Sequence, residues 1–168
     1  EPPDNPKRQR TILLDSTLKM WGMPRIFALA AALACAKNSK HGELIEAYVL
    51  GGAKYKETGL DSKEEIIKTL ETLDHAMHCG DALESIIREI PATEQNEYIL
   101  ITSEESIKTP SFQRSFSNVK DSLSYLMFVS RTGKLEFFSC VNGRTKLLSK
   151  ANFDLERILF FSDETKRK

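Results

Sequence analysis

The sequence predicts an α/β domain built on a doubly wound, mostly parallel sheet that is flanked by helices and carries an antiparallel hairpin at one edge. Three observations support this class. Short apolar runs of strand length alternate with amphipathic segments of helical length, an order typical of parallel strands joined by helical crossovers. Two of these runs end abruptly in small polar residues, as buried strands of such sheets do. Asn142-Gly143 lies between two further strand-like runs, and Asn-Gly is a strong hairpin signal.

The fold is expected to begin after a proline-rich lead-in. Residues 1–10 carry three prolines and no apolar periodicity, which predicts a disordered or extended segment. The run 11–14 is apolar and stops at Asp15, the pattern of a strand buried in a parallel sheet. The α/β domain is therefore expected over residues 11–161, followed by a polar tail over 162–168.

Helix and strand signals continue through the rest of this domain. The Ala/Leu-rich segment 25–37 is apolar on nearly every face, which predicts a helix buried against the sheet. Two pairs that resemble capping boxes, Asp61 with Glu64 and Asp81 with Glu84, predict the starts of two amphipathic helices. The remaining elements are expected as strands over 45–50, 98–101 and 123–129, a loop with a short helix over 106–120, hairpin strands over 134–141 and 144–148, and a helix over 154–160.

The composition argues against several classes of function. Lys plus Arg and Asp plus Glu both number 24, so no net charge attracts nucleic acid or an anionic membrane. The longest apolar run, 26–36, is shorter than the roughly 20 residues of a membrane span. The 3 cysteines are widely spaced and odd in number, which favours a reducing compartment. We therefore expect one cytoplasmic domain with neither nucleic acid nor membrane as a partner.

Polar side chains follow two of the predicted strands. Ligands of doubly wound sheets bind at the carboxyl ends of the strands, so Asp15, Thr17, Thr102 and Ser103 are expected to lie near one another. Asp15 taken alone could equally be a strand-end carboxylate that accepts backbone hydrogen bonds.

Three motifs resemble, in order, the metal site of von Willebrand factor A domains. The run Ile12-Leu13-Leu14-Asp15-Ser16-Thr17-Leu18-Lys19 resembles their first strand and Asp-x-Ser-x-Ser loop, with Lys19 in place of the last serine. The run His78-Cys79-Gly80-Asp81-Ala82-Leu83 resembles the loop that supplies a threonine ligand, here replaced by Cys79. The run Tyr98-Ile99-Leu100-Ile101-Thr102-Ser103 resembles a strand followed by Thr-Asp-Gly, with Ser103 in place of the aspartate. The resemblance implies a Rossmann-like, A-like fold with a degenerate metal-ion-dependent adhesion site.

The replacements argue against a bound metal. A hard divalent cation binds oxygen ligands that carry negative charge, whereas this site keeps one carboxylate and gains an ammonium group. Lys19 is therefore expected to pair with Asp15 and to occupy the position of the ion. No cofactor is expected, and an A-like domain that still binds magnesium at the strand ends is kept as an alternative.

The tract 15–36 is similar to bacterial A-like domains encoded with a MoxR-type AAA+ ATPase and β-propeller proteins. The run 133–137 and the pair Asp154-Leu155 also resemble that group. The resemblance implies a non-enzymatic adaptor that binds these proteins. Trp21 beside Arg25 is typical of a binding hot spot, although a Trp packed over the sheet edge fits equally. The expected partner-binding residues are Asp15, Thr17, Lys19, Trp21, Arg25 and Ser103.

An enzymatic alternative uses the same strand end. Asp15, followed later by Thr102 and Ser103, also resembles the motifs of haloacid-dehalogenase-like phosphohydrolases, in which Asp15 would be the nucleophile. Such enzymes hold magnesium with further acids past a later strand. Residues 130–133 read Ser-Arg-Thr-Gly, so those acids are missing.

A second metal hypothesis concerns the segment before the Ala-Leu helix. His75, His78 and Cys79 are residue types that bind zinc, and Cys140 could supply a fourth ligand. No Cys-x-x-Cys pair is present, so these residues are expected instead to form a helix end and loop beside the degenerate site.

Overall fold

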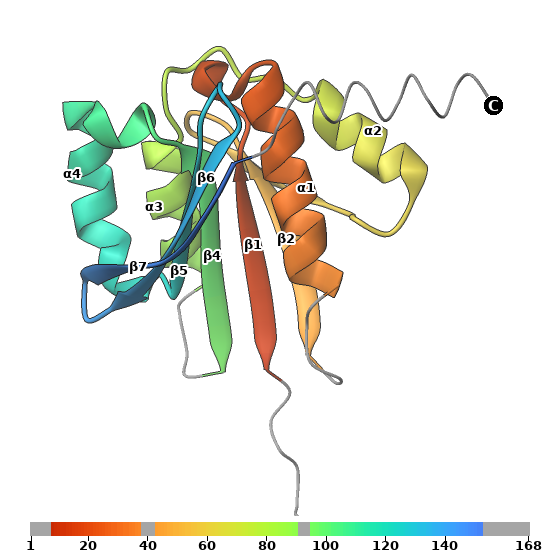
Figure 1. Ribbon diagram of the computed structural model, residues 1–168. Helices are drawn as coiled ribbons and strands as arrows, with labels where there is room; N and C mark the ends of the chain where they lie inside the picture. Colours follow the sequence, from red (N-terminus) through yellow and green to blue (C-terminus); the bar gives the residue numbers. More distant parts are fainter. Residues whose placement is uncertain (1–7, 38–42, 91–94, 153–168) are drawn as a thin grey trace, which may run out of the picture.

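The structure is a computed structural model that describes residues 8–37, 43–90 and 95–152. Within these ranges, seven strands form a single sheet and four α-helices cover its two faces (Figure 1). The strands are β1 (Gln9–Asp15), β2 (Leu44–Leu50), β3 (Tyr55–Thr58), β4 (Asn96–Ser103), β5 (Tyr125–Val129), β6 (Lys134–Val141) and β7 (Arg144–Asn152). The helices are α1 (Met23–Lys37), α2 (Lys63–Glu71), α3 (Gly80–Glu89) and α4 (Pro110–Val119), with short 3-10 helices η1 (Leu18–Met20), η2 (Ser106–Lys108) and η3 (Lys120–Ser122).

The sheet is mixed. Its strand order is β3-β2-β1-β4-β5-β6-β7, and the pairs β1–β2, β1–β4 and β4–β5 are parallel. The pairs β2–β3, β5–β6 and β6–β7 are antiparallel. The predicted α/β class and edge hairpin are confirmed, but the prediction of a mostly parallel sheet is wrong, because β3 adds a second antiparallel edge that the sequence pattern did not reveal.

The two faces of the sheet bury two separate clusters. Successive side chains of a strand point to opposite faces, so Ile12 and Leu14 pack with α1 and α2, while Leu13 packs with α3 and α4. Figure 1 shows α1 in front of the central strands and α3 and α4 behind β4 and β5. No helix in the described ranges is long and apolar enough to cross a membrane.

The lead-in is shorter than predicted. β1 begins at Gln9, whose backbone N–H donates to the carbonyl of Gln95, and Arg10 forms an ion pair of 3.1 Å with Glu97. These two residues belong to the sheet because a strand on each side of β1 satisfies their backbone groups. Residues 1–7, the helix predicted over 154–160 and the tail predicted over 162–168 lie outside the described residues.

Helix starts differ from the capping predictions by one or two positions. The N-cap of α2 is Ser62, whose hydroxyl accepts a hydrogen bond from the backbone N–H of Glu65. The N-cap of α3 is Cys79, so Asp81 lies in the first turn, where a carboxylate stabilises the helix dipole. The short helix predicted within 106–120 extends over the ten residues of α4, which begins at Pro110.

The β6–β7 hairpin confirms the Asn-Gly prediction. Asn142 and Gly143 join the strands with φ angles of 52° and 73°, and two positive φ values are what a two-residue hairpin turn of the matching twist requires. β7 continues to Asn152, beyond the predicted end at residue 148.

Candidate functional site

The candidate site lies where the strand order changes direction. β1 has β2 on one side and β4 on the other, so the connections from β1 and β4 leave toward opposite faces of the sheet. In α/β sheets this arrangement opens a crevice at the carboxyl ends of the two strands, where ligands bind. Asp15 ends β1, and Thr102 and Ser103 end β4.

Asp15 is the centre of a buried hydrogen-bond cluster. Its Oδ1 accepts bonds from the backbone N–H of Thr17 at 2.8 Å and from the hydroxyl of Thr17 at 2.6 Å. Its Oδ2 accepts a bond from the hydroxyl of Thr102 at 2.6 Å. Only 4% of Asp15 is exposed, and burial raises the pKa of its carboxyl, while the hydroxyls of Thr102 and Thr17 lower it.

Cys79 completes this cluster. It is fully buried, and its thiol hydrogen-bonds to Asp15. Burial, followed by the charge of Asp15, raises the pKa of the Cys79 thiol well above its ordinary value. A thiol held in this way is a neutral donor, since the thiolate is the nucleophilic form of cysteine. The predicted proximity of Cys79 to Asp15 is confirmed.

Ser103 lies apart from this cluster. Because side chains alternate along β4, Thr102 shares the face of Leu100 and Asp15, whereas Ser103 shares the face of Ile101. The Ser103 hydroxyl accepts a hydrogen bond from the backbone N–H of Glu105. The expected grouping of Asp15, Thr17 and Thr102 is confirmed, and Ser103 lies at the same strand end but with its hydroxyl bonded to Glu105.

The predicted pairing of Lys19 with Asp15 is wrong. The Lys19 ammonium donates to the Thr109 hydroxyl at 2.5 Å and to the Glu105 carbonyl at 3.3 Å. Its long side chain therefore joins η1 to the start of α4, and the charge stays near the solvent, where the desolvation cost is smaller. The carboxylate of Asp15 is satisfied by neutral donors.

Trp21 and Arg25 form a cation–π contact in which the arginine is the buried residue. Trp21 is 53% exposed, whereas Arg25 is 8% exposed, and the guanidinium of Arg25 lies 5.3 Å from the centre of the indole ring. Arg25 also donates to the carbonyls of Leu70 and Ser16. The structure thus places Trp21 on the surface and Arg25 beneath it, as a support.

Burial reduces the expected partner-binding surface. Of its predicted members, the four buried ones cannot contact a partner in this conformation, namely Asp15, Thr17, Arg25 and Ser103. Trp21 and Lys19 are the members with exposed or partly exposed side chains. The buried residues instead hold the loop that presents Trp21.

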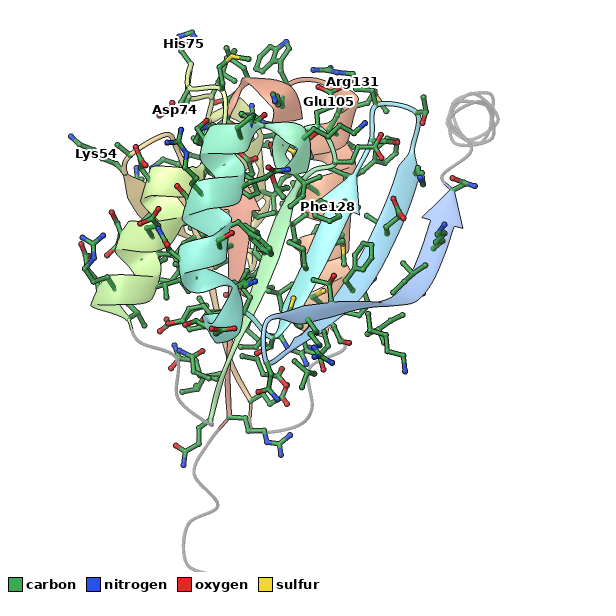
Figure 2. The ribbon with its side chains drawn as sticks, turned by 90° about the vertical axis from the view of Figure 1, so that its left-hand side faces the viewer. Lys54, Asp74, His75, Glu105, Phe128 and Arg131 are labelled. Carbon is green, nitrogen blue, oxygen red and sulfur yellow. The ribbon has the colours of Figure 1, made fainter. Side chains whose placement is uncertain are left out.

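Sequence reasoning missed Met77, Glu105 and Arg131, which lie at the same end of the sheet as Trp21. The backbone of Leu18 donates to the carbonyl of Ala76, which brings the neighbouring Met77, 56% exposed, to the same end of the sheet. Arg131 donates to the carbonyl of Trp21 and lies 4.0 Å from Glu105. Figure 2 shows His75, Glu105 and Arg131 at this end of the molecule. We call Trp21, His75, Met77, Glu105 and Arg131 the interaction edge.

The zinc hypothesis does not agree with the geometry. His78 accepts a hydrogen bond from the backbone N–H of Gly80 through Nδ1, and its Nε2 lies 2.7 Å from the Ser111 hydroxyl. Cys140 donates its N–H to the carbonyl of Ser124, before β5 begins, and so lies at the opposite end of the sheet. Among the residues that the structure describes, no group of three or more His, Cys, Asp or Glu side chains could hold a metal ion. His78 lies in the loop before α3, so the expected loop is confirmed, whereas the expected helix end is not, because α2 already ends at Glu71.

No protein-family model and no curated protein matches the chain. The A-like resemblance thus stays a prediction that rests on its three motifs.

Proposed function

We propose that this chain is a non-enzymatic protein-interaction domain of the A-like type, which binds a protein partner through the interaction edge. The observation that carries this proposal is Trp21. A tryptophan with 53% of its surface exposed sits on a buried guanidinium and has its backbone carbonyl held by Arg131. Exposed aromatic residues held in one orientation are typical of interface hot spots.

Pre-organisation is the physical advantage of this arrangement. Ordering side chains at an interface costs free energy on association, and the indole ring of Trp21 already lies over Arg25, while its backbone carbonyl accepts a hydrogen bond from Arg131. Met77 adds apolar surface at the same end of the sheet. The exposed Glu105–Arg131 pair supplies the kind of polar rim found around the apolar centres of interfaces.

The donor set around Asp15 supports recognition without a metal. A divalent cation of the magnesium or calcium type requires several oxygen ligands, and the cluster offers one carboxylate, two threonine hydroxyls and a neutral thiol. Both carboxylate oxygens of Asp15 already accept hydrogen bonds. These residues fit a structural role, in which the cluster joins the ends of β1 and β4 to the start of α3.

The partner that the motif resemblance favours is a MoxR-type AAA+ ATPase, together with a β-propeller protein, in a bacterial cytoplasm. All three cysteines are free thiols, which is compatible with a reducing compartment. The domain would act in such a complex as an adaptor.

Trp21→Ala tests the proposal against a matched control. Leu44 is also a large exposed apolar residue, 52% exposed, and it begins β2 at the opposite end of the sheet. By titration calorimetry with a MoxR-type ATPase from the same genome, Trp21→Ala is expected to weaken binding by about 30-fold, the loss typical of a hot spot. Leu44→Ala should change the affinity by less than about twofold. Equal losses for the two variants would contradict the assignment of the interaction edge.

The phosphohydrolase alternative has one favourable observation, the contact of 2.6 Å between Asp15 and Thr102. The burial of Asp15 opposes it, because a carboxylate nucleophile must reach the phosphorus atom. With an aryl phosphate and millimolar magnesium, we expect no turnover and no magnesium-dependent rise in melting temperature. Turnover that Asp15→Asn abolishes would establish the enzyme, and a melting shift without turnover would indicate an A-like domain that still binds magnesium.

A further inference from the structure

A groove of about 540 Å³ runs between β3 and α2 at one edge of the sheet. Its volume lies in the range of sites that bind ligands. α2 lines the groove with a single helical face, because the lining residues follow one another at helical spacing. They are Glu65, Lys68, Thr69 and Thr72. The hydroxyls of Thr58 and Thr69 lie 2.5 Å apart, so β3 and α2 touch along one side of the groove.

β3 has a free backbone edge. Within the part of the chain that the structure describes, β2 pairs with one side of β3 and no strand pairs with the other. The carbonyl of Lys54 accepts a hydrogen bond from the backbone N–H of Gly51, so the backbone groups of Lys54 point toward β2. Backbone direction alternates along a strand, which turns the N–H and C=O groups of Tyr55 and Glu57 outward. An edge of this kind accepts a further strand.

The groove and this free edge belong to the same surface. Thr58 lies opposite Ala47 of β2, which packs on the face that carries α1 and α2. Lys56 is two residues away from Thr58 and therefore shares this face. The ring of Tyr55 packs on the other face, and the side chain of Glu57 follows it. Tyr55 and Glu57 thus line the groove with their backbone.

The middle of the groove is basic. The lysines that line it are Lys54, Lys56 and Lys68, and Figure 2 shows Lys54 projecting from this edge of the molecule. Among the described residues, none of these ammonium groups lies within 4.0 Å of a carboxylate. The carboxylates of the lining lie at the two ends, Glu65 beside Gly59 and Asp74 beside Gly51. An acidic side chain in the middle would meet ammonium groups that have no other partner there.

We propose that an extended segment of a partner protein adds to the outer edge of β3 as an antiparallel strand and directs acidic side chains toward Lys54, Lys56 and Lys68. Backbone hydrogen bonds to Tyr55 and Glu57 provide affinity, and the groove beside α2 selects the side chains. A second copy of β3 fits poorly, because pairing through these backbone groups sets Lys56 opposite Lys56 or Glu57 opposite Glu57. Like charges directly opposite are destabilising. This inference does not depend on the function of the interaction edge.

A peptide of alternating residues, Thr-Glu-Thr-Glu-Thr-Glu-Thr with a fluorescein label, tests the strand pairing. Its threonines lie opposite Tyr55 and Glu57 and form the backbone hydrogen bonds, while its glutamates face α2. Fluorescence anisotropy at low ionic strength, where exposed charges are least screened, should show saturable binding below about 1 mM peptide. N-methylation of the threonines should weaken binding by at least about tenfold, because it removes donors to β3. N-methylation of the glutamates, whose N–H groups point to solvent, should change the affinity by less than about threefold.

Two lysine variants of the full chain test the charge pairing. Lys56→Glu should weaken binding by about tenfold, because it replaces a cross-strand pair of opposite charges by a pair of like charges. Lys146→Glu is the matched control, since Lys146 is an exposed lysine of the other edge strand, β7, and the substitution changes the net charge equally. It should change the affinity by less than about twofold.

Equal losses for the two lysine variants, or for the two methylated peptides, would overturn the proposal in favour of unspecific attraction of an anion. A peptide with lysine in place of each glutamate should not bind. Binding of that peptide with the same affinity, or no saturable binding of the glutamate peptide, would also overturn the proposal.

Discussion

The parallel centre of the sheet and its antiparallel flank are built from similar apolar residues but bury them to different extents. The central strands β1 and β4 have helices on both faces, and Ile12, Leu13 and Leu100 have no exposed surface. In β7, at the far side of the flank, every residue is exposed, including Leu147 and Leu148. A residue's contribution to the stability of this fold therefore depends more on how many faces of its strand are covered than on how apolar its side chain is.

The largest expected effect compares one leucine from each region. Leu100→Ala removes a fully buried side chain from β4 and should lower the free energy of unfolding by about 2–5 kcal/mol. Leu147→Ala, at a position 42% exposed in β7, should change it by less than about 0.5 kcal/mol. Urea denaturation measures both values. A similar loss in both variants would mean that β7 is covered on that face, and the contrast between centre and flank would fail.

A smaller effect compares two glycines with positive φ, one in each region. Gly143 in the β6–β7 turn has φ +73°, and an added Cβ would lie 2.5 Å from the Asp121 carboxylate. Gly22 lies between η1 and α1, in the connection that follows the central strand β1. It has φ +84°, and no atom lies within 4 Å of the position of an added Cβ. Gly143→Ala and Gly22→Ala should each cost about 1–2 kcal/mol from backbone strain, with the larger loss at Gly143.

Thermal melting of these two variants checks this ranking. Equal losses would show that the Asp121 side chain moves aside at no cost. A larger loss at Gly22 would instead indicate that the loop presenting Trp21 is the more constrained of the two.

The smallest expected effect appears only as a dependence on pH. Burial raises the pKa of Asp15 above 3.8, its ordinary value, so the folded state holds a proton that the unfolded state releases first. The stability due to the neutral carboxyl is therefore complete below pH 3.8 and decreases as the pH rises through the folded-state pKa. Asp15→Asn cannot ionise and should gain stability relative to the wild type as the pH rises from that value.

Urea denaturation of the wild type and Asp15→Asn at pH 4 and pH 7 measures this difference. A difference that stays constant between the two pH values would contradict the raised pKa. Thr102→Val, which removes a donor to Asp15 without changing the titrating group, serves as the control for lost hydrogen bonding, and the pH dependence should persist in it.

The sequence predicted those parts of the fold whose signals are local. The apolar run before Asp15 and the Asn142-Gly143 turn have one obvious structure each, and both are confirmed. β3 was missed because Tyr-Lys-Glu-Thr is short and largely charged, so its pairing with β2 provides the only signal. The helix α4 was underestimated because its apolar side, Phe112 and Phe116, is diluted by six polar positions.

The candidate site was harder to predict because its contacts depend on side-chain direction. The approach of Cys79 to Asp15 followed from motif order and is confirmed. Thr102 rather than Ser103 faces Asp15 because a strand alternates its sides, which fixes the contact only when the register is known. The path of Lys19 toward Thr109 depends on where α4 begins, and the importance of Arg131 depends on a loop between β5 and β6 that meets η1 only in three dimensions.

The exposed outer edge of β7 has a consequence for the behaviour of the protein in solution. Within the part of the chain that the structure describes, no strand pairs with the outer side of the nine-residue β7, and the free backbone N–H and C=O groups of such an edge can pair with another chain. Arg144, Lys146 and Lys150 are spaced along it, and two edges brought together would oppose like charges. Positive charge at this edge thus protects the protein against aggregation, and this protection weakens as salt screens the repulsion.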